Sequence, residues 1–261
     1  MRKLLTFLIA LGAIVFAVVS QVFAFGYGFQ GGCGGGYNSA GGFSGGGCGA
    51  APFVHFASSN GSTTAVTSFT FSSQGIGTAD PNRLVVVCIG GGPGSGAFTV
   101  TGVTIGGNAA THVSGASAYD SGGGLSDIWY LAVPTGTTAT IAVTFSQSLT
   151  RSSIAVYSVT GPGVAVSAGF NNAISLSGNS IAKAVTGIPS GGGTIAAAYL
   201  HTATAGTITQ TNLSNDTGSV VAGSSTMVSG NNTSLSGSQT FTTAWAGTAT
   251  DSAMSVVTFS P

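Results

Sequence analysis

A regular alternation of apolar and polar residues from Leu125 to Gly161 constrains the fold of this chain more than any other feature. In the middle of this stretch the apolar side chains fall on one face of an extended chain, namely Ala139, Ile141, Val143 and Phe145. A period of two is typical of a half-buried antiparallel strand. The β-rich segments 127–133 and 154–159 flank it, each across a short polar turn. We therefore predict a three-stranded meander, with Phe145 in the core and Thr144 at the surface.

Further β-type segments follow one another from Pro52 to the C-terminus, with Gly-rich turns between them. Segment 84–89 is apolar on both faces, which predicts a central strand and a buried, inert thiol at Cys88. No segment after Ala24 shows a convincing helical period. Residues 52–261 are therefore predicted to form an all-β domain of the sandwich or barrel class, with two packed antiparallel sheets.

The last predicted strand, 254–259, is also largely apolar on both faces. A strand of this kind belongs inside a sheet rather than at its edge. We expect it to pair with a strand of the first half, 84–89 or 154–159, as the closing strand of a jelly roll does. The alternative is two small sandwiches divided near Gly161 to Gly163.

The first residues of the chain predict export. Arg2 and Lys3 precede an uncharged run from Leu4 to Ala24, which at about 1.5 Å per residue is long enough to cross a bilayer as a hydrophobic helix. Val22-Phe23-Ala24 also fits a small-residue cleavage site. Residues 1–24 are thus either a signal peptide or a retained membrane anchor, and both alternatives place the rest of the chain outside the cell.

Residues 25–51 have a low-complexity composition, with aromatic residues scattered among glycines. Glycine loses too much entropy on ordering for such a segment to form a core, so we predict a flexible stalk. Cys33 and Cys48 lie inside it. In an exported protein they are candidates for a disulfide, and the alternative is two free or intermolecular thiols.

Charge is scarce along the whole chain. Charged residues make up 4% of the sequence and glutamate is absent. After residue 24, three basic residues remain against five aspartates. No basic surface is available to neutralise phosphates, which argues against nucleic acid as a partner.

Two glycine-rich motifs imitate known sites without their structural context. Gly92 to Ala97 fits a dinucleotide fingerprint, but a β-rich segment follows it where that chemistry needs a helix N-terminus. Gly42 to Gly46 fits a nucleophile elbow, yet it lies in the predicted stalk. The histidines His55, His112 and His201 carry no sequence signature of a catalytic triad. We therefore predict a protein that is not an enzyme, with no catalytic or cofactor-binding residue.

The segment from Tyr119 to Asp127 is the candidate metal site. Asp120 and Asp127 bracket a Gly-rich loop whose carboxylates and backbone carbonyls are the hard oxygen ligands that calcium prefers. Aspartate is also a common turn residue, and the spacing matches no EF-hand. Calcium through Asp120 and Asp127 is thus one reading, and an ordinary turn without a metal is the other.

Five aromatic residues are candidates for a sugar-binding platform or for the core: Trp129, Tyr130, Tyr157, Tyr199 and Trp245. Aromatic residues in strands usually belong to the core. Trp129 and Tyr130 are adjacent, so their side chains point to opposite faces of a strand. One of them must leave the core, or a second layer must cover it.

Several segments together resemble a β-sandwich module that recurs in exported bacterial and phage surface proteins. These segments are Arg83–Val87, Val103–Ala110, Ile128–Leu131 and Val256–Phe259. The resemblance implies a jelly-roll-like sandwich on a cell or virion surface, and it carries no catalytic residue across.

The sequence thus predicts a non-enzymatic, extracellular structural or adhesive protein, such as a phage spike or minor capsid component or a bacterial surface protein. The alternative is a carbohydrate-binding or receptor-binding β-sandwich module. The expected partners are further copies of the chain in a homo-oligomer or larger surface assembly, and glycans in the alternative. Residues 4–24 add a membrane contact if they are retained.

Overall fold

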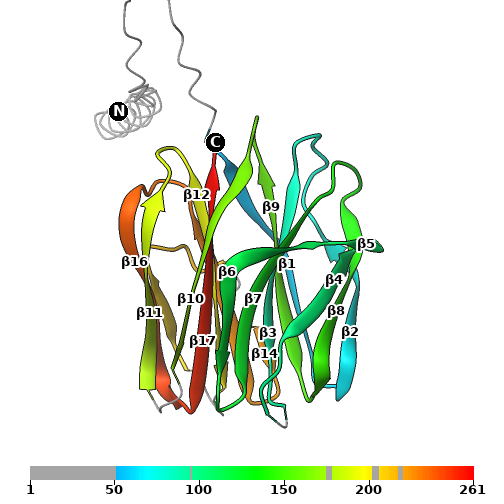
Figure 1. The fold of residues 1–261 in the computed structure, drawn as a ribbon, viewed down its shortest axis with the longest axis vertical. Coiled ribbons are helices and arrows are strands. Elements are labelled where there is room, and N and C mark those ends of the chain that lie inside the picture. Colours follow the sequence, from blue (N-terminus) through cyan, green and yellow to red (C-terminus); the bar gives the residue numbers. More distant parts are fainter. Residues whose placement is uncertain (1–50, 95, 175–177, 202–205, 217–219) are drawn as a thin grey trace, which may run out of the picture. The chain divides into compact units, whose positions relative to one another are not determined.

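The computed structural model describes residues 51–94, 96–174, 178–201, 206–216 and 220–261. All regular secondary structure in these residues is β, as predicted, and they belong to one compact unit that spans Gly49–Pro261 (Figure 1). Among them there is no helix with the length and hydrophobicity needed to cross a bilayer. The predictions for the signal peptide or anchor, for the stalk up to residue 50 and for the Cys33–Cys48 disulfide lie outside the described residues.

The described strands form four antiparallel sheets. Outer sheet 1 has the order β2-β8-β4-β5, with bounds Val66–Gly75, Thr138–Leu149, Val100–Ile105 and Asn108–Ala109. Inner sheet 1 has the order β1-β9-β3-β7-β6, with bounds Phe53–Ser62, Ser152–Thr160, Leu84–Gly91, Gly124–Ala132 and Thr111–Asp120. Inner sheet 2 has the order β10-β17-β12-β15-β14, with bounds Ala165–Ile174, Asp251–Ser260, Gly193–His201, Ser225–Asn232 and Val220–Ala222. Outer sheet 2 has the order β11-β16-β13, with bounds Gly178–Ile188, Gly237–Ala249 and Ile208–Thr211.

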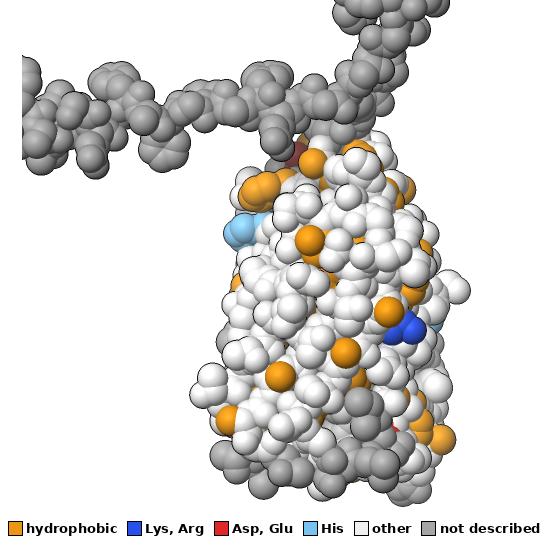
Figure 2. All heavy atoms as spheres, turned by 90° about the vertical axis from the view of Figure 1, so that its left-hand side faces the viewer, with side chains coloured by type: hydrophobic (Ala, Val, Ile, Leu, Met, Phe, Trp, Pro, Cys, Tyr) orange, Lys and Arg blue, Asp and Glu red, His pale blue; other side chains and the backbone are white. Residues whose placement is uncertain are grey.

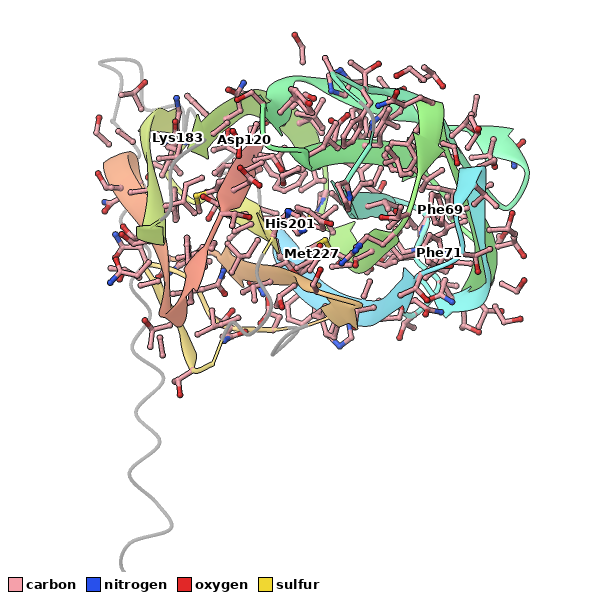
Figure 3. All side chains as sticks on the ribbon, turned by 90° about the horizontal axis from the view of Figure 1, so that it is seen from below. Phe69, Phe71, Asp120, Lys183, His201 and Met227 are labelled. Carbon is pink, nitrogen blue, oxygen red and sulfur yellow. The ribbon has the colours of Figure 1, made fainter. Side chains whose placement is uncertain are left out.

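The four sheets stack as layers, with three hydrophobic cores between them (Figure 1). The first core lies between outer sheet 1 and inner sheet 1, and contains Phe69 and Phe71, which Figure 3 labels. The middle core lies between the two inner sheets and includes Tyr157, Tyr199 and Met227. The third core lies between inner sheet 2 and outer sheet 2. The prediction of two packed sheets is therefore wrong in number, because the described chain builds four.

Burial on both faces explains the strands that are apolar throughout. In β3, Val85, Val87 and Ile89 contribute to the first core, whereas Val86 and Cys88 contribute to the middle core. Residues of one strand point alternately to its two faces, so a strand covered on both sides needs an apolar residue at every position. Cys88 is fully buried and burial raises the pKa of its thiol, which confirms the buried thiol predicted from the sequence.

The second half of the chain repeats the topology of the first. Inner sheet 2 follows the strand order of inner sheet 1, with β10 in the place of β1 and β17 in that of β9. Outer sheet 2 follows that of outer sheet 1, with β11 in the place of β2, except that it has no described counterpart of β5. In the last hairpin of each half the equivalent residues lie 100 positions apart, as in Phe145 and Trp245. Thr150 and Thr250 both donate a hydroxyl hydrogen bond to a main-chain carbonyl, that of Gly92 at 3.3 Å and that of His201 at 3.0 Å.

This duplication corrects the predicted pairing of the last strand. β17 pairs with β10 and β12 of its own half, and not with β3 or β9. Its residues Val257 and Phe259 instead pack face to face against inner sheet 1 through the middle core. The alternative boundary near Gly161 to Gly163 does fall between the two halves, but the halves share a core and form one unit.

Arg83 links the end of inner sheet 1 to the loops between β2 and β3 and between β7 and β8 through hydrogen bonds. The residue is 1% exposed and its guanidinium donates five hydrogen bonds of 2.7 to 2.9 Å to main-chain carbonyls, those of Gly77, Thr78, Val133, Thr135 and Gly136. Burial lowers the pKa of Arg83, while the nearby Asp80 carboxylate opposes this shift. The planar guanidinium presents five N–H donors in a fixed geometry, which suits it to hold several carbonyls at once.

Candidate functional site

A histidine–aspartate pair lies on the edge of inner sheet 1. His112 on β6 has its Nε2 atom 2.8 Å from Oδ1 of Asp127 on β7. The same Asp127 oxygen accepts a 2.8 Å hydrogen bond from the main-chain N–H of Ile128. The Asp127 side chain is 3% exposed and that of His112 is 37% exposed, so the imidazole screens the carboxylate from solvent.

A groove of about 300 Å³ surrounds this pair, which we call the His112 groove; it is lined by Thr99, Val100, His112, Ser117, Asp127 and Trp129. The imidazole of His112 lies 5.1 Å from the indole of Trp129, with the rings tilted by 50°. Ser117 is directly opposite Asp127 in the strand pair, but no hydrogen bond joins its hydroxyl to His112 in the described structure. The groove therefore contains a Ser, a His and an Asp without the continuous hydrogen-bond chain of a triad.

Protonation of His112 should stabilise the folded protein. The hydrogen bond to Asp127 raises the pKa of His112 above its ordinary value of 6.5; burial opposes this effect and the Asp127 charge adds to it. Because the folded pKa is the higher one, the contribution is fully present below about pH 6.5 and is lost as the pH rises through the folded pKa. We expect the stability advantage of the wild type over His112→Gln to shrink between about pH 6 and pH 9.

Two measurements check this prediction. An NMR titration should give a pKa above 6.5 for His112, and thermal melts across the pH range should show the two proteins converging at alkaline pH. A wild-type advantage that grows with pH would contradict the assignment of the pair.

The structure places the two candidate calcium ligands on different faces of inner sheet 1. Asp127 is opposite Ser117 in the strand pair, and Asp120 is opposite Gly124. The three steps along β6 that separate these positions span about 10 Å and reverse the direction of the side chain. The described residues contain no group of three or more His, Cys, Asp or Glu side chains that could hold a metal ion.

The predicted aromatic platform is mostly core. Tyr157 and Tyr199 are 0% exposed in the middle core, and Trp245 is 4% exposed in the third core. Trp129 packs against the first core and Tyr130 against the middle core. The expectation that these two neighbours point to opposite faces is confirmed, because a second layer covers the other face of their sheet.

A second groove lies at the end of β1, and sequence reasoning missed it. Phe53 and His55 are exposed on either side of the buried Val54, and their rings stack with centroids 6.3 Å apart and an interplanar angle of 15°. Together with the loop between β2 and β3, they line a space of about 170 Å³, which we call the Phe53 groove; its residues are Phe53, His55, Thr78, Ala79, Asp80, Ser158 and Thr160. Phe53 lies two residues after the Gly-rich segment, and the sequence around it shows no alternation that would identify Phe53 and His55 as a surface pair.

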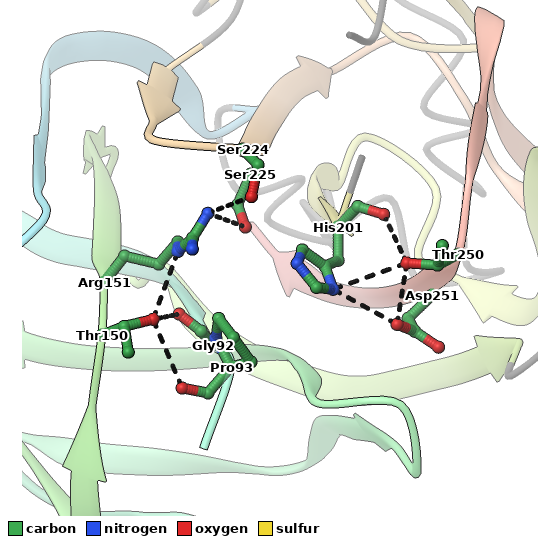
Figure 4. A network of polar contacts seen from close by, with 9 residues as sticks. All are labelled: Gly92, Pro93, Thr150, Arg151, His201, Ser224, Ser225, Thr250 and Asp251. Carbon is green, nitrogen blue, oxygen red and sulfur yellow. Dashed lines mark hydrogen bonds and ion pairs between the residues drawn. The ribbon is translucent and has the colours of Figure 1, made fainter. Parts of the chain in front are cut away.

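Polar contacts join the two halves where their strands end (Figure 4). Arg151 of the first half donates to Ser224 Oγ at 2.5 Å and to Ser225 Oγ at 3.4 Å in the second half. At the equivalent position of the second half, Asp251 lies 3.3 Å from Nδ1 of His201 and accepts a hydrogen bond from the Thr250 hydroxyl. The Arg151 contacts join the two halves, whereas the contact between His201 and Asp251 lies within the second half, and we assign both a structural role.

The comparisons with known proteins do not assign this chain to a family. No protein-family model and no curated protein matches this chain. Among solved structures, the chain is similar to the conserved protein of unknown function PA5104 from Pseudomonas aeruginosa PAO1, with 8% sequence identity, a TM-score of 0.27 and coverage of 81% of this chain and 84% of that chain. A likeness of this degree carries no functional argument.

Proposed function

We propose that this chain is an exported, non-enzymatic structural or adhesive protein that works in a surface assembly of its own copies. The observation that carries the proposal is the make-up of the two outward sheet faces. On outer sheet 1, cross-strand neighbours on the outward side include Ser68 with Thr144, and Thr70 with Ala142. Outer sheet 2 repeats this pattern with Ala182 opposite Thr242, Ala184 opposite Thr240, and Thr209 opposite Ala244.

No described side chain on these outward faces is charged. Lys183 lies on β11 opposite the buried Phe241, which places its side chain on the inward side of outer sheet 2. A charge on the edge strand β11 disfavours pairing of this edge with a strand of another chain. Because the side chain is on the inward side, the outer face of the sheet stays neutral. Figure 2, which looks at this side of the molecule, shows mostly white atoms (backbone and uncharged polar side chains) with scattered hydrophobic side chains, and one Lys or Arg side chain near an edge.

Faces of this kind suit contact with another flat surface. Small hydroxyl and methyl groups lose little side-chain entropy when they are covered, and no charge has to leave water. Net charge near zero also removes the repulsion that keeps many proteins apart. The Leu4–Ala24 segment and the resemblance to exported surface modules support a location outside the cell. The strand orders of the two halves support a jelly roll in each half, rather than one across the whole domain.

Charged substitutions on one outer face test the proposal. We expect sedimentation velocity of the full-length chain to show oligomers whose abundance changes little between low and high salt, because no ion pairs hold them. Ala184→Glu with Thr242→Glu should shift the chain to smaller species. The matched control, Thr64→Glu with Ala65→Glu, adds the same charge to an exposed turn and should leave the distribution unchanged. A wild type that is monomeric at every concentration, or a face variant that associates as the wild type does, would contradict the proposal.

A further inference from the structure

The Phe53 groove has the make-up of a site for a sugar ring. We propose that it binds one ring of a neutral carbohydrate, with the apolar face of the sugar on Phe53 and its hydroxyls toward Asp80, Ser158 and Thr160. This inference rests on the adhesive part of the proposed function and names a ligand class and a site for it.

The exposed aromatic ring is the first argument. Phe53 is the one large hydrophobic side chain that the described residues leave exposed, at 65%. The stacked imidazole of His55 extends its flat surface along the strand. The face of an aromatic ring is electron-rich, so it attracts the polarised C–H groups on one side of a sugar ring, and covering it also removes apolar area from water.

The polar rim is the second argument. Thr160 is opposite Phe53 and Ser158 is opposite His55 in the pairing of β1 with β9, so two hydroxyls lie beside the two rings. No hydrogen bond within the described part of the chain uses either hydroxyl. Asp80 accepts one main-chain hydrogen bond, from Asn82 at 2.7 Å. A carboxylate has about four accepting positions, so Asp80 retains the capacity to bind sugar hydroxyls through charge-assisted hydrogen bonds.

The loop between β2 and β3 that carries Asp80 is fixed in position without a ligand. Arg83 binds the carbonyls of Gly77 and Thr78, two residues of this loop. Gly77 lies so close to β9 that a Cβ there would be 2.6 Å from the Cβ of Ser158. Because these residues are already fixed, binding a ligand would cost less conformational entropy.

Size and charge narrow the ligand class. The groove of about 170 Å³ is below the roughly 300–1,000 Å³ of sites for drug-sized molecules, so it suits a single ring of a longer glycan. The Asp80 carboxylate repels acidic sugars, which argues against them as ligands. The His112 groove is the weaker candidate, because its Asp127 is 3% exposed and already bonded to His112 and Ile128.

Binding measurements on the full-length chain test the inference. A printed array of neutral glycans identifies the sugars that are retained, and saturation-transfer NMR with methyl β-D-glucopyranoside, methyl β-D-galactopyranoside and N-acetylglucosamine follows the bound ring. We expect Phe53→Ala to weaken binding by about tenfold or more and Phe53→Trp to preserve it. Asp80→Asn, which keeps an oxygen for the Asn82 N–H, should also weaken binding. Thr64→Ala, in the exposed turn between β1 and β2, is the control.

Melting temperatures show that the variants remain folded, since Phe53 is largely outside the core. The inference is overturned if no neutral glycan is retained, or if Phe53→Ala binds as tightly as the wild type. If the array retains no glycan but the chain forms salt-insensitive oligomers, the sugar site is ruled out and the surface-assembly proposal remains supported. Sugar binding by a chain that stays monomeric would support the sugar site and contradict the surface-assembly proposal.

Discussion

Replacement of Arg83 by methionine is expected to lower the free energy of unfolding by at least about 4 kcal/mol, or to prevent folding. Methionine keeps an extended, unbranched side chain but removes every donor, so the five carbonyls that the guanidinium binds lose their partner together. Each buried acceptor left without a partner costs about 1–3 kcal/mol, less wherever water reaches it. Both loops held by Arg83 should loosen with this change.

Urea denaturation of the wild type and the variants measures this effect. Arg83→Lys should recover only part of the stability, because an ammonium group has three donors on one atom and cannot span five carbonyls. Lys183→Met removes a positive charge from the half-buried side of an edge strand, and we expect a change within about 1 kcal/mol. If Arg83→Met were as stable as Lys183→Met, the buried guanidinium would not be the support that its geometry indicates.

Phe145→Ala should destabilise the protein by about 3–5 kcal/mol. Phe145 is 1% exposed in the first core, where its ring makes edge contacts with Phe69 at 5.7 Å and with Phe98 at 6.2 Å. Its neighbour Thr144 points to the other face, is half-buried, and forms a 3.2 Å hydroxyl contact with Ser68. Thr144→Ala should therefore cost no more than about 1 kcal/mol.

Thermal and chemical denaturation of both variants distinguish the two faces of β8. The unfolding free energies should differ by at least about 2 kcal/mol between the variants. Equal losses would mean that the register of β8 between β2 and β4 is wrong, since the register is what assigns the two residues to opposite sides.

Local alternation was enough to predict the β architecture. The period of two in 139–145 placed Phe145 in the core, and the apolar runs of 84–89 and 254–259 predicted strands inside a sheet, as β3 and β17 are. Thr144 is half-buried rather than fully exposed, because β8 lies between β2 and β4. The adjacency of Trp129 and Tyr130 left two alternatives, that one of them leaves the core or that a second layer covers it, and inner sheet 2 provides that layer.

The duplication is faint in the sequence because few equivalent residues are identical: Thr150 recurs as Thr250, but most positions differ. Tyr157 corresponds to Val257, and Arg151 corresponds to Asp251, so the sandwich is preserved by burial and not by residue identity. Without the repeat, a closing strand between the two halves was the natural topology for β17. The actual partners depend on long-range pairing, which local periodicity does not encode.

The candidate sites depended even more on tertiary structure. The Phe53 groove joins the start of β1 to residues of β9 and of the loop after β2, about 25 and 105 positions away in sequence. The sequence predicts Asp127 as an oxygen ligand beside Asp120, whereas strand pairing brings it to His112 instead.

Exposure of the sandwich on intact cells or particles tests the central proposal most directly. Antibodies raised against residues 52–261 would be applied to the cells or particles that produce the chain, before and after permeabilisation. A surface protein predicts full labelling without permeabilisation, and assembly through the neutral outer faces predicts that labelling occurs in clusters, which Ala184→Glu with Thr242→Glu disperses. Labelling that appears only after permeabilisation would contradict it.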